Sequence, residues 1–270
     1  MKERHPDCTV LVTSCDKYVD VEGPFSVLWR KYWPDCPFET VLLSETHGAE
    51  GFDRVILTGT GKCWCQMLVE ALDQISTPYV IMLMNDYYLE SPVDTNNILH
   101  RLEQAKTFNA ANLRLNPNPP GRTPFVPDAL SADARTTDLL EFPNNVAYCV
   151  TCQTGIWNRD YLRGLAARNK SAWEFERFGS FMLEGETRPL LVTPTKEFPF
   201  LDVVHKGYWE PWGVRVLREN GIDYDFSKRG TPPFRVRAIE FVKKLVFLVF
   251  PWTFIVRVQN ALGAGAKERR

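Results

Sequence analysis

The chain has 270 residues, of which 44% are apolar and 24% charged, and its formal net charge is −1. This length fits one large domain, or one domain with a small appendage, and the apolar fraction is enough for a sizeable core. A chain so close to neutrality is not expected to bind nucleic acid in bulk, and no segment has the composition of a disordered chain.

Short apolar strands alternate with helices over the first ninety residues. This alternation predicts an α/β fold with a Rossmann-like, mostly parallel sheet that is covered by helices on both faces. In chain order we expect a strand at Thr9–Thr13, a helix containing Phe25, Leu28 and Trp29, strands at Glu39–Leu43 and Asp53–Leu57, a helix at Cys63–Ile75 and a strand at Tyr79–Met84.

Polar clusters follow three of these strands, at Thr13–Asp16, Ser44–Thr46 and Asn85–Asp86. Parallel strands end at the same edge of their sheet, and ligands of open α/β sheets bind outside that edge. The sequence therefore predicts a ligand site where the three clusters meet.

Later elements are less regular. Asn116–Pro127 contains five prolines and one glycine, which excludes a helix or a central strand and predicts a long surface loop. We expect a buried strand at Val146–Thr154, a helix from about Tyr161, and a further helix opened by Ser171.

Asp86 is the first candidate for chemistry, because a carboxylate at a strand end can hold Mg²⁺ or Mn²⁺ beside a diphosphate. The alternative is that Asp86 only caps the following turn. His205 is a candidate late metal ligand, although a lone histidine is more often structural.

Glu174 and Glu176 are candidates for a general base, which the transfer of a sugar to a hydroxyl requires. Ser171-x-x-Glu174 also reads as a capping box, in which Glu174 would serve only the helix start. Glu176 has no such structural explanation in the sequence.

Aromatic residues are frequent near these positions, and their rings can stack on the apolar faces of sugars. The competing interpretation for each ring is ordinary core packing. The candidates for sugar stacking are Tyr87, Tyr88, Trp157, Trp173 and Trp209, with Trp212 close by in sequence.

Seven cysteines and a start without an apolar signal-peptide region predict free thiols in a reducing, cytoplasmic compartment. Cys149 and Cys152 have a spacing found in zinc sites. Their alternative role is as small apolar residues of a buried strand.

The C-terminal stretch Lys228–Arg270 contains ten Lys or Arg and two Glu, so it carries about +8 while the remaining residues carry about −9. Its apolar run Leu245–Val256 is interrupted by Pro251 and is too short to span a bilayer. We expect 228–270 to be a separate tail, following a catalytic domain at 1–227. Within the tail, 241–258 would be an amphipathic helix on the anionic inner face of the cell membrane. The alternative is a helix packed on the domain or on a partner.

The order of these motifs resembles that of bacterial glycosyltransferases of the GT-A fold that assemble surface polysaccharides. The matching pieces are Thr9–Tyr18, Cys63–Leu89, Thr154-Gly155-Ile156-Trp157 and Trp173-Glu174-Phe175-Glu176. The chain departs from the family pattern at Asn85, where an aspartate is common, and in having Glu-Phe-Glu instead of paired acids.

The resemblance implies roles by position. Thr13, Ser14 and Asp16 would hold the nucleotide base and ribose, with Ser44 or Glu45 nearby. Asp86 would bind the metal and the diphosphate of a nucleotide-sugar donor, and Glu174 or Glu176 would be the base of an inverting transfer.

These expectations combine into a glycosyltransferase that moves a sugar to a hydroxyl of a lipid-linked glycan. One alternative is a non-catalytic protein of the same fold that acts as a scaffold for polysaccharide assembly. A nucleotidyltransferase is less favoured, because Thr13–Tyr18 has neither the glycine nor the arginine of a typical nucleotidyltransferase loop.

Overall fold

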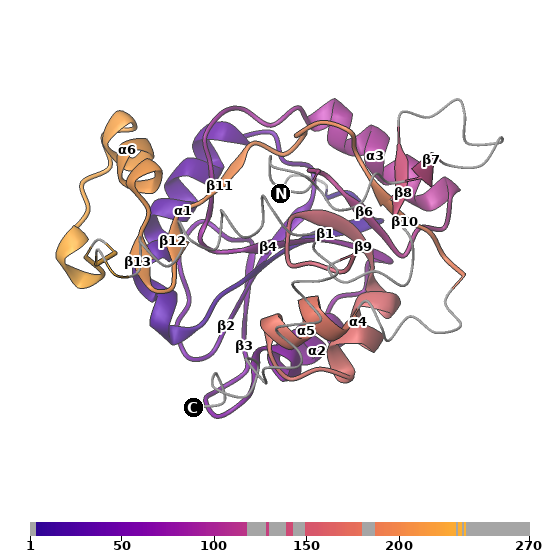
Figure 1. Ribbon diagram of the computed structural model, residues 1–270, viewed down its shortest axis with the longest axis horizontal. Helices are drawn as coiled ribbons and strands as arrows, with labels where there is room; N and C mark the ends of the chain where they lie inside the picture. Colours follow the sequence, from indigo (N-terminus) through magenta and orange to yellow (C-terminus); the bar gives the residue numbers. More distant parts are fainter. Residues whose placement is uncertain are drawn as a thin grey trace.

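The computed structural model describes residues 4–117, 128–129, 139–142, 149–179, 187–230, 232–233 and 235. A nine-stranded sheet of order β3-β2-β1-β4-β9-β6-β10-β8-β7 forms its centre (Figure 1). The strands are β1 (Cys8–Thr13), β2 (Glu39–Ser44), β3 (Arg54–Leu57), β4 (Tyr79–Met84), β6 (Asn112–Arg114), β7 (Asp128–Ala129), β8 (Leu140–Phe142), β9 (Gly155–Asn158) and β10 (Leu190–Val192).

The sheet is mostly parallel, as predicted. β3, β2, β1 and β4 pair in parallel, and so do β6 and β10. Within the described nine-stranded sheet only β9 and β8 run against the rest, since β9 is antiparallel to β4 and β6, and β8 is antiparallel to β10 and β7. The strands predicted in the first ninety residues are all confirmed to within one residue at either end.

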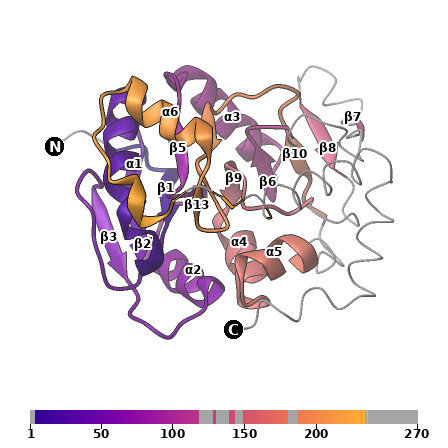
Figure 2. The ribbon, with the colours of Figure 1, turned by 60° about the vertical axis from the view of Figure 1, so that its left-hand side comes forward.

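Helices cover both faces of the sheet (Figure 2). In β1 the side chains of Val10 and Val12 enter one hydrophobic cluster, whereas Leu11 between them enters the other. The first cluster is covered by α1 (Val19–Tyr32), α3 (Thr95–Thr107) and α6 (Pro211–Glu219). The second is covered by α2 (Trp64–Asp73), α4 (Arg159–Ala167) and α5 (Ala172–Phe178). Because both faces are buried, β1, β2 and β4 are rich in apolar residues.

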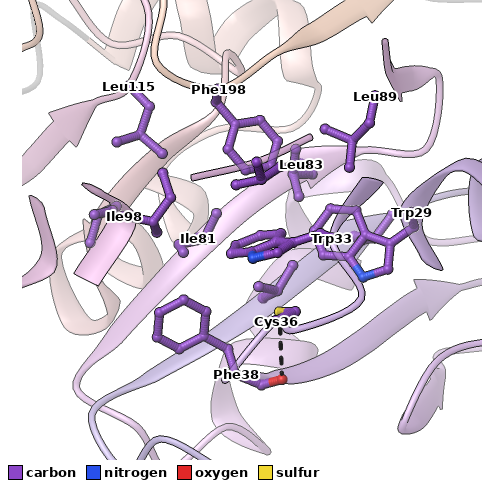
Figure 3. Packing of buried hydrophobic residues seen from close by; sticks show 14 of the residues in the cluster. Trp29, Trp33, Cys36, Phe38, Ile81, Leu83, Leu89, Ile98, Leu115 and Phe198 are labelled. Atoms are coloured by element: carbon purple, nitrogen blue, oxygen red, sulfur yellow. Dashed lines mark hydrogen bonds between the residues drawn. The ribbon is translucent and has the colours of Figure 1, made fainter. Parts of the chain in front are cut away.

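Several aromatic side chains pack together within the first cluster (Figure 3). Trp29 and Trp33 at the end of α1 lie 5.0 Å apart between ring centroids, and Trp33 meets Phe198 edge-on at 5.5 Å. The Trp33 indole donates a hydrogen bond to Thr95 Oγ1 at 2.8 Å, so its polar atom is satisfied although the ring is buried. This packing fixes α1 against α3 beside the amino end of β2.

The strand predicted at Val146–Thr154 is wrong over its described part. Residues 149–154 have no regular structure, and β9 begins only at Gly155. The Cys152 amide and the Thr151 hydroxyl donate to the Glu176 carboxylate, so these groups are bonded outside any strand ladder. A Cβ on Gly155 would lie only 2.8 Å from Asn112 Nδ2, which shows how closely β9 approaches β6.

The C-terminal tail lies outside the described residues from residue 236 onward, and so does the proline-rich loop after Pro117. The boundary at residue 227 and the membrane-associated helix at 241–258 remain predictions. Within the described ranges, no helix combines the length and apolar character needed to cross a bilayer.

Candidate active site

The three polar clusters predicted to share one edge do meet there. The Asn85 amide donates to Thr13 O at 3.1 Å, and the Ser14 amide donates to Leu43 O at 2.8 Å. The strand order reverses at β1, because the chain proceeds outward through β2 and β3 and then returns to β4 on the other side of β1. Such a switch point opens a crevice at the carboxyl ends of the strands. The site is therefore centred on the ends of β1 and β4.

Asp86 leaves this edge directly after β4 and meets a second carboxylate from far along the chain. β5 (Tyr87–Leu89) pairs antiparallel with β11 (Phe200–Asp202), with Tyr87 opposite Asp202. The Val203 amide donates to the Asp86 carbonyl at 2.9 Å. This small ladder places Asp202 beside Asp86, a juxtaposition that the sequence analysis missed.

The environment of the two carboxyl groups raises both of their pKa values. Loss of water contact raises the pKa of Asp86 to about 7, against the opposing effects of its own backbone amide and of Arg229. Asp202 belongs to the exposed residues, yet loss of water contact around its carboxyl group and then the Asp86 charge raise its pKa to about 8. Glu210 and Glu176 add smaller repulsions of the same sign to Asp202.

This concentration of like charge fits a divalent cation. Two carboxylates that disfavour each other's ionisation are relieved when a cation binds between them. Their oxygens are also the hard ligands that Mg²⁺ and Mn²⁺ prefer. Asp86 and Asp202 are therefore the residues that would hold such an ion.

The metal-free protein is expected to lose stability as the pH rises from about 4 to about 8, between the unfolded and the folded pKa values of the two carboxyl groups. A carboxyl group whose pKa is raised on folding contributes stability below its unfolded pKa, and that contribution disappears as the pH rises through the folded pKa. Thermal unfolding in a chelator across this range should show the melting temperature falling by a few degrees. Asp86→Asn should flatten the decline. An equal slope in the variant would contradict the assignment.

Glu176 is held at the side of this site by the irregular segment before β9. Its Oε1 accepts hydrogen bonds from the Thr151 hydroxyl and the Cys152 amide, both at 2.8 Å. Its Oε2 accepts no hydrogen bond from the described residues. One oxygen thus fixes the carboxylate while the other is left to take a proton, as a general base requires.

Glu174 has the structural role that the capping-box interpretation predicted. The Glu174 amide donates to Ser171 Oγ at 3.2 Å, and the Glu174 carboxylate accepts from the Lys170 amide at 3.1 Å. In a capping box the Glu174 carboxylate would accept from the Ser171 amide, and here it accepts from the amide of the preceding residue instead. These contacts favour Glu176 over Glu174 as the base.

Asp16 and Glu45 join the ends of β1 and β2. The Asp16 amide donates to Glu45 Oε2 at 2.9 Å, and the Asp16 carboxylate accepts from the Thr46 amide and hydroxyl and from His47. The hydrogen bond to His47 lowers the pKa of Asp16, and the same bond raises the pKa of His47. Asp16 is partly exposed, so its assignment to nucleoside binding stays a prediction.

Thr13 and Ser14 require a correction, because their hydroxyls are turned into the protein and do not face a ligand. Thr13 Oγ1 donates to Leu83 O at 3.3 Å, and Ser14 Oγ donates to Glu22 Oε1 at 2.5 Å. Ser44 Oγ is also buried, and it has no hydrogen-bond partner among the described residues. A nucleotide at this edge would contact Asp16 and Glu45 before it reached these hydroxyls.

The sugar-stacking predictions for Tyr88, Trp157 and Trp209 are wrong, because all three side chains are fully buried. Tyr88 donates to Val21 O, and the two indoles pack among core aromatics. Tyr87 is half-buried and stacks on Phe200 at 4.4 Å beside the acidic pair. Trp173 is 53% exposed on α5. These two rings remain candidates for sugar contact.

His205 lies three residues after Asp202, at the end of β12 (Val204–His205). This strand pairs with β13 (Tyr208–Trp209). The role of His205 as a metal ligand stays a prediction. Within the described ranges, one set of three His, Cys, Asp or Glu side chains lies close enough together to share a metal ion, namely His5, Asp7 and Glu103. That set is beside the amino end of β1, and Lys106 pairs with both of its carboxylates. The Lys106 ammonium already neutralises this cluster, so it is a different kind of site.

Arg229 was also missed by the sequence analysis. Its guanidinium makes two bonds to the Asp20 carboxylate, at 2.7 and 2.5 Å, and lies 4.4 Å from the centroid of the Tyr18 ring. Both partners of this ion pair are nearly buried. The pair anchors the segment after α6 to the start of α1. The positive charge of Arg229 also opposes the rise in the pKa of Asp86 that burial causes. No local sequence pattern connects positions so far apart.

No protein-family model matches the chain, and no curated protein matches it in sequence. Solved structures resemble it distantly. A cytidylyltransferase from Leptospira borgpetersenii aligns with 80% of this chain and 96% of its own, at 10% identity and a TM-score of 0.43. S. aureus TarS 1-349 in complex with UDP-GlcNAc aligns with 83% of this chain and 69% of its own, at 14% identity and a TM-score of 0.46. The chain spans 41% of a longer TarS structure. These likenesses are too distant to assign a substrate or a reaction.

Proposed function

We propose that this protein is a glycosyltransferase that uses a nucleotide-sugar donor and a divalent cation. The observation that carries the proposal is the acidic pair of Asp86 and Asp202 at the switch point of the sheet, with Glu176 beside it. An anionic diphosphate would be repelled by these carboxylates alone, so the arrangement calls for a cation that both can share. The order of motifs that resembles GT-A glycosyltransferases supports the same reading.

The chain's own groups account for the main steps of an inverting transfer. Glu176 Oε2 would accept the proton of the acceptor hydroxyl as that oxygen attacks the anomeric carbon and the bond to the nucleotide diphosphate breaks. Its Oε1 stays bonded to Thr151 and Cys152, so the base is held in place. A bound divalent cation would neutralise the charge that develops on the leaving diphosphate. Tyr87 and Trp173 would orient the sugars.

The donor would lie across the ends of β1, β2 and β4. Asp16 and Glu45 would meet the nucleoside, and Asp86 and Asp202 would meet the diphosphate through the cation. The half-buried Tyr87–Phe200 stack stands next to this acidic pair, where it can pack against a sugar face. A lipid-linked glycan at the inner face of the cell membrane remains our proposal for the acceptor, and it depends on the basic tail.

Thermal stability in the presence of UDP-, GDP-, CMP- and dTDP-sugars, with and without Mn²⁺, tests the donor class. A ligand at about a hundred times its Kd stabilises the native state by about 2.7 kcal/mol, which should raise the melting temperature by several degrees. We expect one nucleotide to give a shift that depends on Mn²⁺. No shift with any donor would overturn the proposal and favour the scaffold alternative.

A further inference from the structure

Asn85 stands where an aspartate is common in proteins with this order of motifs, yet its side chain does not face the acidic pair. It is 3% exposed, and its Nδ2 donates to Ser14 Oγ at 2.7 Å and to Tyr18 O at 3.2 Å. Its backbone amide donates to Thr13 O at 3.1 Å. Asn85 therefore joins the end of β4 to the end of β1 and to the turn that leads into α1.

The chain of contacts continues from Ser14 to a buried carboxyl group. Ser14 Oγ is 2.5 Å from Glu22 Oε1, and Glu22 is 1% exposed in the first turn of α1. Glu22 Oε2 is buried without a hydrogen-bond partner among the described residues. Burial raises the pKa of Glu22 above its usual value, and the bond from Ser14 opposes that rise.

Proton counting explains why an amide occupies position 85. A serine hydroxyl has one proton to donate and two lone pairs that accept. Ser14 gives its proton to Glu22, so its other neighbour must be a donor, which the Asn85 amide is. An aspartate at 85 would place two buried carboxylates on one hydroxyl, and one of them would lose its hydrogen bond.

We propose that Asn85 is a positioning residue that, with Ser14 and Glu22, fixes the strand-end turn carrying Asp86, and that it is not a weakened metal ligand. This inference rests on the proposed function, because it assigns the network the task of holding Asp86 at the cation site. It also removes one reason for favouring a non-catalytic scaffold, since the amide is what this network requires.

Exchanging the carboxyl and amide groups tests the inference. Asn85→Asp alone should lower the melting temperature by about 5 °C and weaken Mn²⁺ binding about tenfold, because the turn before Asp86 is disturbed. Glu22→Gln alone should have a smaller effect. In the double variant Ser14 can donate to the new carboxylate and accept from the new amide, while Tyr18 O still lacks its donor. The double variant should therefore melt above Asn85→Asp and regain the part of the stability and Mn²⁺ affinity that the Ser14 bonds supply.

The competing view gives the opposite result. If residue 85 faced the cation, Asn85→Asp would add a ligand and strengthen Mn²⁺ binding, and Glu22→Gln would rescue nothing. Either outcome overturns the inference. Should Asn85→Asp fail to fold, the yield and melting temperature of the double variant provide the same comparison. If the wild-type protein binds no Mn²⁺, the proposed function fails. The melting temperatures of the wild type, the two single variants and the double variant would still show whether Asn85, Ser14 and Glu22 form one hydrogen-bond network.

Discussion

Replacing Glu176 by glutamine is expected to lower kcat about 10²- to 10⁴-fold while leaving the KM for the donor nearly unchanged. Loss of a general base has an effect of this size. Glutamine can still accept the hydrogen bonds from Thr151 and Cys152 through its carbonyl oxygen, so the loop and α5 should keep their positions. The decrease in kcat would then come from slower proton transfer and not from weaker binding of the donor.

Glu174→Gln is the matched control, because it lies two residues earlier in the same helix and serves the helix cap. We expect this variant to retain kcat within about threefold and to lose only part of a capping interaction. Steady-state kinetics of both variants, with the donor identified by the thermal panel, makes the comparison. An equal loss in the two variants, or more than a tenth of wild-type kcat in Glu176→Gln, would refute the assignment of the base.

Asp86→Asn and Asp202→Asn are each expected to weaken Mn²⁺ binding about a hundredfold or more and to abolish the Mn²⁺-dependent shift by the donor. Each substitution removes a charged oxygen ligand while preserving the shape of the side chain. The same changes remove a carboxyl group whose ionisation is disfavoured by loss of water contact and, at Asp202, also by the Asp86 charge. The metal-free variants should therefore melt at a higher temperature than the wild-type protein at pH 8.

A higher melting temperature together with weaker Mn²⁺ binding indicates the loss of a metal ligand. Structural damage would instead lower both the stability and the Mn²⁺ affinity. Asp35→Asn is a suitable control, because Asp35 is exposed in the turn before β2, at the opposite edge of the sheet. It should change neither property. Calorimetric titration of Mn²⁺ and thermal unfolding in a chelator measure the two effects. If Asp202→Asn binds Mn²⁺ as tightly as the wild type, the shared cation site is refuted.

Local patterns in the sequence were sufficient for the layout of the sheet. The apolar runs that became β1, β2 and β4 are buried on both faces, so their composition alone distinguishes them from surface strands. The capping box at Ser171 was also readable, because its residues interact within a single helical turn. Polar clusters at the strand ends pointed to the candidate site, since parallel strands end at one edge of their sheet.

The composition of the site was decided by tertiary contacts. Asp202 reaches Asp86 only because β11 pairs with β5, and a two-stranded ladder of short strands has no distinctive sequence pattern. Trp157 and Trp209 were expected at the surface of the site, yet an isolated tryptophan carries no signal that separates a ring for stacking from a ring in the core. Burial of those rings follows from the helices that close over them.

For this protein, the sequence by itself determined the α/β class, the positions of the central strands and the sheet edge that carries the candidate site, because each can be recognised from the residue pattern within short segments. The tertiary structure alone decided which acids meet at that edge, which hydrogen bonds hold Glu176 and Glu174, and which groups surround the amide of Asn85. Those questions concern hydrogen bonds and charges between segments distant in the chain, such as Ser14 with Glu22 and Asn85, and pairing over such distances depends on the folded arrangement of the whole sheet.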